Sequence, residues 1–347
     1  MPLPIPKSAA HKRAEKIFGT GSLLNPLNWP KTAFCYFFGS SISKVVLPAQ
    51  VLSTEQDFLQ GTATLEASFV RKVDKNPMLQ LDFHTLDCFD GASLETMELT
   101  HNEQIDKPKA EQEYVIYLCG NGMCMQDLYH EIYDMCLATQ RNFVAFNLKN
   151  VIKSHGTVRS ELDLINDVIS QIEHLRTEGV ELNNICLVGH SLGAAFATLT
   201  AYTYYKEGTP IKIFNGRSFS NFASLSYLQE KNGGSSEFRA WMKKVSLQLS
   251  NFDIEVAKYY DKIPPQYKDY ITINEGPTEG DEQNTPDGVI PMEISLRSAI
   301  RDQDEYHLVR SGNRLTGIGH NDPLRTLEAE DGQTAEERCC SFILKKS

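Results

Sequence analysis

The sequence has no basic cluster and no long apolar run, and these absences exclude several classes of protein. Its 347 residues include 34 lysines and arginines against 45 aspartates and glutamates, a formal net charge of -11. Because phosphates are held by a positive field, this charge argues against a nucleic-acid partner. Residues 1–20 contain charges but no apolar segment, and the most apolar stretch, 34–51, is interrupted by glycine, serines and lysine. We therefore expect neither a signal peptide nor a membrane span.

The cysteines lack the CxxC pairing that is typical of zinc sites. The eight of them stand at positions 35, 88, 119, 124, 136, 186, 339 and 340. Cys119 and Cys186 fall inside apolar runs, where a thiol behaves as a small apolar side chain. This usage predicts a reducing compartment, and we expect neither a metal nor another cofactor.

The most informative segment is residues 185–198, with the sequence ICLVGHSLGAAFAT. A short apolar run meets Gly-His-Ser-Leu-Gly and continues into small helix formers, which predicts a strand, a sharp turn and a helix with Ser191 at the apex. A serine hydroxyl is a weak nucleophile unless it stands clear of the backbone beside a base, and such a turn provides this exposure. Gly189 and Gly193 allow the strand and helix backbones to approach closely.

The remaining pattern predicts one α/β domain over residues 63–327, after an N-terminal extension at 1–62 and before a tail at 328–347. Half-exposed strands at 65–73, 79–83 and 94–99 predict an antiparallel entry to a sheet. The expected α/β alternation then has strands at 114–119, 142–148, 185–190, 211–214 and 270–273, and helices at 127–139, 158–178, 192–206 and through much of 219–262, a segment that could form a cap. Such alternation implies parallel strands with the active site at their carboxyl ends.

The partners of the serine are sought after it in the chain, since the acid and the histidine follow the nucleophile in this arrangement. Of the two later histidines, His320 lies in a glycine-flanked loop and is the expected base, whereas His307 lies in a polar segment and reads as a solvated surface residue. Asp287 precedes a short apolar segment that could anchor its loop, so we expect it to orient His320 through Nδ1. Asp281 and Glu282 in the same loop are its rivals.

Two backbone amides are expected to hold the oxyanion. The N–H of Leu192 begins the helix after the serine, and the N–H of Asn121 lies in a glycine-bounded loop after an apolar strand, with Gly122 or Met123 as neighbours.

Other polar residues have a structural explanation. His190 is expected to pack or tune the turn, and Asp163 and Asp167 are expected on the solvated face of a helix. The aromatic and apolar residues of 219–262 fit either an acyl channel or helix faces packed on the sheet.

With this serine turn, the Gly-Asn-Gly loop, Asp287 and His320 in order, residues 63–327 resemble the α/β-hydrolase superfamily. Residues 114–123 (YVIYLCGNGM) and 214–220 (FNGRSFS) look like the lipase-like SidB/SdbA group of Legionella effectors and related chlamydial proteins. Cys119 departs from the superfamily pattern, because many relatives have a histidine at this position, before the oxyanion glycine. The resemblance implies a serine hydrolase that cleaves a carboxylic ester of a lipid or acylated molecule through an acyl-enzyme.

The effector resemblance also implies a place of action. Acidic residues before the apolar segment 342–344 look like a Dot/Icm type IV secretion signal, although a plain charged tail or acylation at 339–340 would fit the same residues. It implies a bacterial cytoplasmic protein that is translocated into host cytosol or membranes, with host proteins and peripheral membrane contact as partners. The alternative function is a catalytically silent hydrolase fold that binds a host protein.

Overall fold

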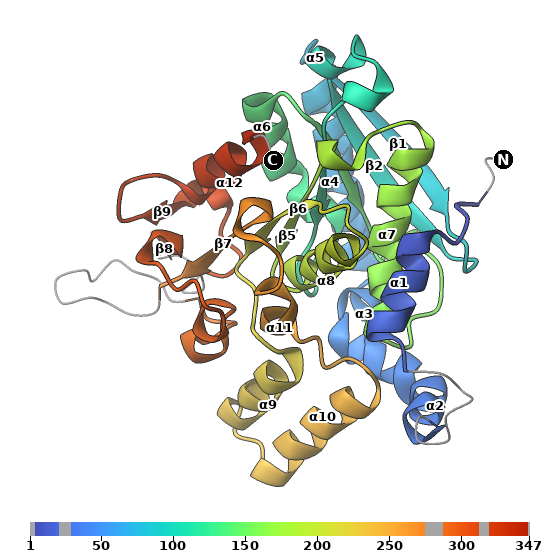
Figure 1. The fold of residues 1–347 in the computed structure, drawn as a ribbon, viewed down its shortest axis with the longest axis vertical. Helices are drawn as coiled ribbons and strands as arrows, with labels where there is room; N and C mark the ends of the chain where they lie inside the picture. The colour runs from blue at the N-terminus through green and yellow to red at the C-terminus, as the bar shows by residue number, and fades with distance from the viewer. Residues whose placement is uncertain (1–3, 21–28, 275–286, 312–318, 346–347) are drawn as a thin grey trace.

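A mixed sheet forms the centre of the structure, a computed structural model that describes residues 4–20, 29–274, 287–311 and 319–345. Within these residues the strands lie in the order β1-β2-β4-β3-β5-β6-β7-β8-β9 (Figure 1). Their bounds are β1 Leu79–Asp87, β2 Ser93–His101, β3 Tyr114–Leu118, β4 Asn142–Phe146, β5 Ile185–His190, β6 Lys212–Gly216, β7 Lys268–Ile273, β8 Leu308–Ser311 and β9 Leu327–Ala329. Neighbours from β4 to β8 pair in parallel, and β1, β2 and β9 add antiparallel edges. The predicted α/β architecture, a mostly parallel sheet flanked by helices with an antiparallel entry, is confirmed.

Helices cover both faces of this sheet. Their bounds are α1 Ala9–Phe18, α2 Trp29–Val46, α3 Ala49–Leu52, α4 Gln56–Asp74, α5 Asn102–Ile105, α6 Tyr129–Thr139, α7 Glu161–Thr177, α8 Leu192–Lys206, α9 Phe222–Asn232, α10 Glu237–Leu249, α11 Val256–Tyr260 and α12 Ala335–Leu344. Buried residues of α1, α7, α8 and α11 form the core on one face, and those of α4, α6 and α12 form it on the other. Among the helices described, none has the length and apolar character needed to cross a bilayer.

The central strands explain the apolar runs of the sequence. Every residue of β3, β4, β5 and β6 is buried, because helices cover both faces of these strands. Tyr114 at the start of β3 pairs with Asn142 in β4 and Ile185 in β5. The carboxyl ends of the strands are therefore aligned along one edge, where an active site is expected in this fold.

The prediction of a strand at residues 65–73 is wrong. These residues belong to α4, whose buried side chains Thr62, Phe69 and Val73 recur every four or seven residues. That spacing follows one helix face, although a short window of it also fits strand alternation. Residue 63, the expected start of the hydrolase domain, lies inside this helix.

The sheet continues beyond the last strand that the sequence predicts. β8 and β9 follow β7, and α12 packs against the sheet with Cys339 and Cys340 at 0% and 8% exposure. Acylation of these thiols is therefore incompatible with the folded arrangement, in which both are buried. The segment expected as a tail contributes most of β9 and all of α12 to the core.

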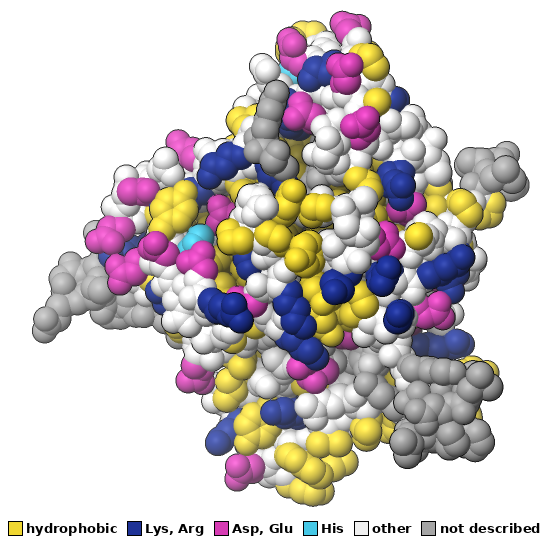
Figure 2. Space-filling view, viewed as in Figure 1, with side chains coloured by type: hydrophobic (Ala, Val, Ile, Leu, Met, Phe, Trp, Pro, Cys, Tyr) yellow, Lys and Arg dark blue, Asp and Glu magenta, His cyan; other side chains and the backbone are white. Residues whose placement is uncertain are grey.

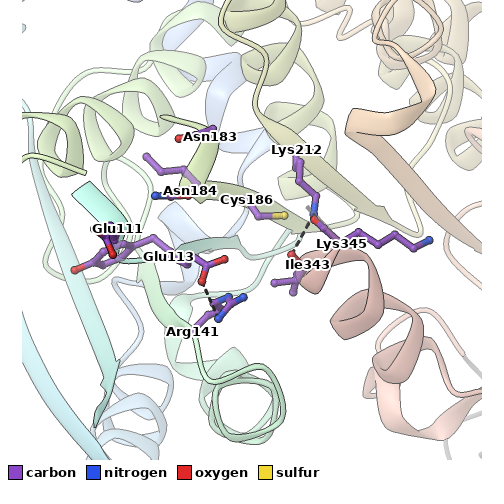
Figure 3. A pocket seen from close by; sticks show the side chains of 11 residues that line it. Glu111, Glu113, Arg141, Asn183, Asn184, Cys186, Lys212, Ile343 and Lys345 are labelled. Carbon is purple, nitrogen blue, oxygen red and sulfur yellow. Dashed lines mark hydrogen bonds and ion pairs between the residues drawn. The ribbon is translucent and has the colours of Figure 1, made fainter. Parts of the chain in front are cut away.

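A polar cavity of about 400 Å³ opens at the amino ends of the strands, on the edge away from the carboxyl ends (Figure 3). On one side of it Lys212 donates to the carbonyl oxygens of Ile343 and Lys345 at 3.1 and 2.6 Å. Arg141 and Glu113 form an ion pair of 2.8 Å on the other side. A lysine ammonium at the last carbonyls of α12 complements the helix dipole and fixes this helix to β6.

Candidate active site

Ser191 stands at a sharp turn between β5 and α8. Its backbone has φ 53° and ψ -115°, a left-handed conformation that is strained for a residue with a side chain. The N–H of Ser191 donates to the carbonyl of Gly216 at the end of β6, with a distance of 2.7 Å. The strand–turn–helix expected from the sequence is present, with the serine at its apex.

The glycines on either side of Ser191 permit this turn. A Cβ at Gly193 would lie 2.4 Å from the carbonyl oxygen of Cys119, and one at Gly189 would lie 2.4 Å from the Cα of Ala194. No side chain fits at such distances. The start of α8 therefore touches the backbone that follows β3, which brings the serine beside the Gly-Asn-Gly loop.

Asp287 and His320 meet in a buried pair. Oδ2 of Asp287 lies 2.9 Å from Nδ1 of His320, and the His320 N–H donates to the Asp287 carbonyl at 3.0 Å. Oδ1 of Asp287 accepts from the N–H groups of Ile290 and Val289 at 2.6 and 3.1 Å. Both side chains are about 95% buried, at 5% and 4% exposure. The carboxylate thus has a fixed position, with Oδ1 as well as Oδ2 at 2.9 Å from the imidazole Nδ1. The rivals Asp281 and Glu282 lie outside the described residues.

The serine and the histidine lie in neighbouring segments. The ring of His190, the residue before Ser191, has its centroid 4.9 Å from that of His320. Among the described residues no hydrogen bond joins Ser191 Oγ to His320. Such bonds are often long without substrate and shorten when it binds.

His190 packs between the loop after β3 and the His320 loop. Its Nε2 lies 3.4 Å from Oδ1 of Asn321, and a Cβ at Gly120 would lie 2.6 Å from its Cδ2. Burial lowers the pKa of His190 well below its ordinary value, and the charges of Arg217 and His320 lower it further. His190 is therefore neutral at physiological pH, and its role is packing.

The expected oxyanion donors lie at the contact between α8 and the loop after β3. Leu192 is the first residue of α8, so its N–H is among those that no intrahelical carbonyl accepts. The N–H of Met123 donates to the Gly120 carbonyl at 3.3 Å, which removes Met123 as a candidate. Asn121 and Gly122 remain in the exposed turn of this loop.

A positioning residue that the sequence analysis missed is Arg217. It follows β6 with φ 56° and is 4% exposed, and its Nη1 donates to the Asp322 carbonyl at 2.6 Å. This bond ties the end of β6 to the loop that carries His320. The available signal was an arginine inside an otherwise uncharged segment, residues 214–220.

Two expectations for polar residues are wrong. His307 is buried, stacks on Tyr270 at 4.0 Å, and lies 3.2 and 3.1 Å from carboxylates of Asp269 and Asp302. Burial lowers the pKa of His307, but the two carboxylates raise it more, so it is raised overall.

Asp167 is also not solvated, because its side chain is 0% exposed and pairs with Lys149 at 2.9 Å. Lys149 binds Asp90 as well, at 2.7 Å, and is itself buried. Burial raises the pKa of Asp167 to about 6, although Lys149 opposes this shift. Asp163, by contrast, caps the start of α7 by accepting from the N–H of Ser160 at 3.0 Å.

The aromatic and apolar residues named here from segment 219–262 fall into two environments. Phe219, Phe222 and Leu225 are buried in the main core. Phe238 and Trp241 are 71% and 50% exposed, on the outer side of α10. The first group packs as helix and loop residues normally do, and the second faces outward.

Residues 129–249, which include Ser191, match the family model of class 3 lipases. A comparison with curated proteins found no match. Among solved structures, the chain is similar to an α/β-hydrolase from Vibrio vulnificus, at 20% identity and a TM-score of 0.47 over 60% of this chain and 69% of that one. An esterase of Pyrococcus furiosus has 16% identity and a TM-score of 0.42 over 58% and 71% of the two chains. An acetyl xylan esterase from Paenibacillus sp. R4 has 14% identity and a TM-score of 0.43 over 63% and 78%.

Proposed function

We propose that the protein is a serine hydrolase that cleaves a carboxylic ester through an acyl-enzyme. The observation that carries this proposal is the buried pair of Asp287 and His320, 2.9 Å apart. The ring of His190, the residue before the strained Ser191, lies 4.9 Å from that of His320. The class 3 lipase match over residues 129–249 supports the same activity. Nearby Cys119 is no competing nucleophile, because burial and Asp127 raise its pKa to about 12.

In the proposed reaction Ser191 Oγ attacks the ester carbonyl while His320 Nε2 takes its proton. Asp287 holds the proton on Nδ1 and stabilises the imidazolium that forms. The amides of Leu192 and Asn121 bind the oxyanion until the C–O bond breaks and the alcohol leaves with the proton from His320. Water then attacks the acyl-enzyme by the same route, which releases the acid and restores the serine.

The test is mass spectrometry of the intact protein after treatment with a fluorophosphonate, beside Ser191→Ala and His320→Ala variants. The proposal predicts one adduct on Ser191 that is absent from both variants. Tyr202→Phe, a change in α8 away from the turn, is the control and keeps the adduct. A folded wild-type protein that forms no adduct would favour the alternative, a hydrolase fold that only binds a partner.

A lipid or long acyl ester is the proposed substrate class. It is supported by the class 3 lipase match and by the exposed aromatic residues of α10. A series of p-nitrophenyl esters of increasing chain length tests this: kcat/KM should rise with chain length. A decline beyond the acetyl ester would assign a small-ester esterase instead.

Action inside a host cell, after type IV translocation, is proposed only from the resemblance of residues 114–123 and 214–220 to the SidB/SdbA group. The test is a translocation reporter fused to the protein in bacteria with and without a Dot/Icm system. Equal reporter signal in the two strains would contradict it.

A further inference from the structure

Two helices at one end of the molecule present aromatic side chains to the outside. They are α2 and α10, and Figure 2 shows apolar side chains gathered at this lower end, where Figure 1 places α10. The exposed fractions are 63% for Tyr36, 72% for Phe37, 54% for Phe38, 71% for Phe238, 50% for Trp241 and 43% for Met242. We call these six residues the docking face. Large aromatic side chains exposed on neighbouring helices are typical of interaction sites.

The two helices are held together as one unit. Cys35 Sγ of α2 donates to the carbonyl of Leu249 at the end of α10, with a distance of 3.6 Å. A Cβ at Gly39 would lie 2.2 Å from the Arg159 carbonyl oxygen, so α2 also lies tightly against the segment before α7. Because Cys35 and Gly39 face inward, the intervening Tyr36, Phe37 and Phe38 are directed outward by packing.

Positive charge accompanies the aromatic residues. The sequences of α2 and α10 contain five lysines and arginines and one carboxylate, although the whole chain has a net charge of -11. Two of these cations, Arg239 and Lys243, pair with Glu230 of α9 at 3.0 and 3.1 Å, whereas Lys44 and Lys244 are outside that ion pair. The Arg159 guanidinium lies 5.0 Å from the ring of Tyr36, and Lys244 Nζ lies 5.9 Å from the ring of Tyr227. Aromatic side chains flanked by cations are typical of surfaces that bind anionic lipids.

The segment that follows α2 reaches the expected active site. A Cβ at Gly122 would lie 3.7 Å from Pro48, which links α2 to α3, and Gln50 Nε2 donates to the Lys149 carbonyl at 3.1 Å. Gly122 follows β3 and Lys149 follows β4, so α2 and α3 lie on the catalytic edge of the sheet. Helix α10 belongs to the segment that follows β6 on the same edge.

We propose that the docking face binds an anionic lipid surface, with the phenyl and indole rings in the interface and the flanking cations on lipid headgroups. Membrane binding itself does not depend on catalysis. Its consequence, that substrate enters the site from the bound membrane, rests on the proposed ester hydrolysis.

The experiment measures co-sedimentation with vesicles of phosphatidylcholine, with and without phosphatidylserine. It uses the full chain as Ser191→Ala, so that hydrolysis cannot change the vesicles and a failure of docking is separate from a failure of catalysis. We expect binding to the anionic vesicles that weakens with added salt. Phe37→Ser with Trp241→Ser should weaken it by about tenfold or more. The control, Met78→Ser with Ile105→Ser, removes two exposed apolar side chains elsewhere on the molecule and should bind normally.

Lys44→Glu with Lys244→Glu is a second variant that keeps every aromatic residue, and it should lose the preference for anionic vesicles. Circular dichroism checks that each variant is folded. Absence of wild-type binding, or equal binding by the Phe37/Trp241 variant, would overturn the proposal. A third result would also overturn it: the wild type is a dimer that does not bind vesicles, and the Phe37/Trp241 variant is a monomer. The docking face would then be occupied by a second copy of the chain.

Discussion

Replacing the carboxylate of Asp287 with an amide tests the proposed site most sharply. In Asp287→Asn the amide oxygen is held by the N–H groups of Ile290 and Val289, which now bind Oδ1 at 2.6 and 3.1 Å. The NH₂ group then faces His320 Nδ1 in place of Oδ2, which lies at 2.9 Å in the wild type. A donor at that position opposes a proton on Nδ1 and favours the tautomer with the proton on Nε2, in which His320 cannot accept the serine proton.

The expected loss is about ten-thousandfold in kcat for an ester substrate, equivalent to about 5 kcal/mol of transition-state stabilisation. KM should change little, because the substituted group does not contact substrate. The assay is p-nitrophenyl butyrate hydrolysis by protein whose thermal unfolding matches the wild type. Asp281→Asn and Glu282→Gln are the controls and should keep normal activity. If Asp287→Asn remained within about tenfold of the wild type while one of these controls lost activity, the assignment of the acid would be refuted.

Three further predictions concern the structure around the site. Gly193→Ala places a methyl group 2.4 Å from the Cys119 carbonyl oxygen, so thermal unfolding should show a loss of about 1–3 kcal/mol, and wild-type stability would contradict the close contact. Lys149→Met leaves the fully buried Asp167 without its cation and should lower the free energy of unfolding in urea by about 3–5 kcal/mol. Adding Asp167→Leu to the same chain should restore part of this loss. A loss below about 1 kcal/mol would show that the pair is solvated. The pKa of His307 is raised in the folded protein, so protonation of His307 stabilises the fold. This contribution to the free energy of unfolding is complete below about pH 6.5 and is lost as pH rises through the folded pKa. In thermal unfolding, His307→Gln should therefore make stability depend less on pH, and an unchanged pH dependence would refute the contribution.

The sequence predicted features that depend on neighbouring residues. The serine turn could be recognised because Gly189 and Gly193 stand beside Ser191 and because the strand and helix signals adjoin it. Asp287 was selected over its rivals for the apolar segment after it, and the N–H of Ile290 in that segment indeed binds its carboxylate.

Features that depend on distant residues could not be predicted in this way. The partner of Asp167 is Lys149, which lies 18 positions earlier at the end of another strand, so the helix pattern alone indicated a solvated carboxylate. His307 likewise pairs with Asp269, which lies in β7, far from it in the sequence. The α4 helix was missed for another reason, since a few apolar residues at short spacing fit both the helical and the extended period.

Lys212 attaches α12 to β6, so residues 335–344 cannot be folded into this helix and bound by a peptide receptor as an extended strand at the same time. A receptor that reads residues 335–344 as an extended strand must first break the bonds from Lys212 and expose Cys339 and Phe342 to water. Such a receptor would therefore select chains that have not yet folded, or would have to unfold this edge of the sheet mechanically. A fusion partner joined after α12 is, by the same reasoning, anchored to β6 and not tethered by a free linker.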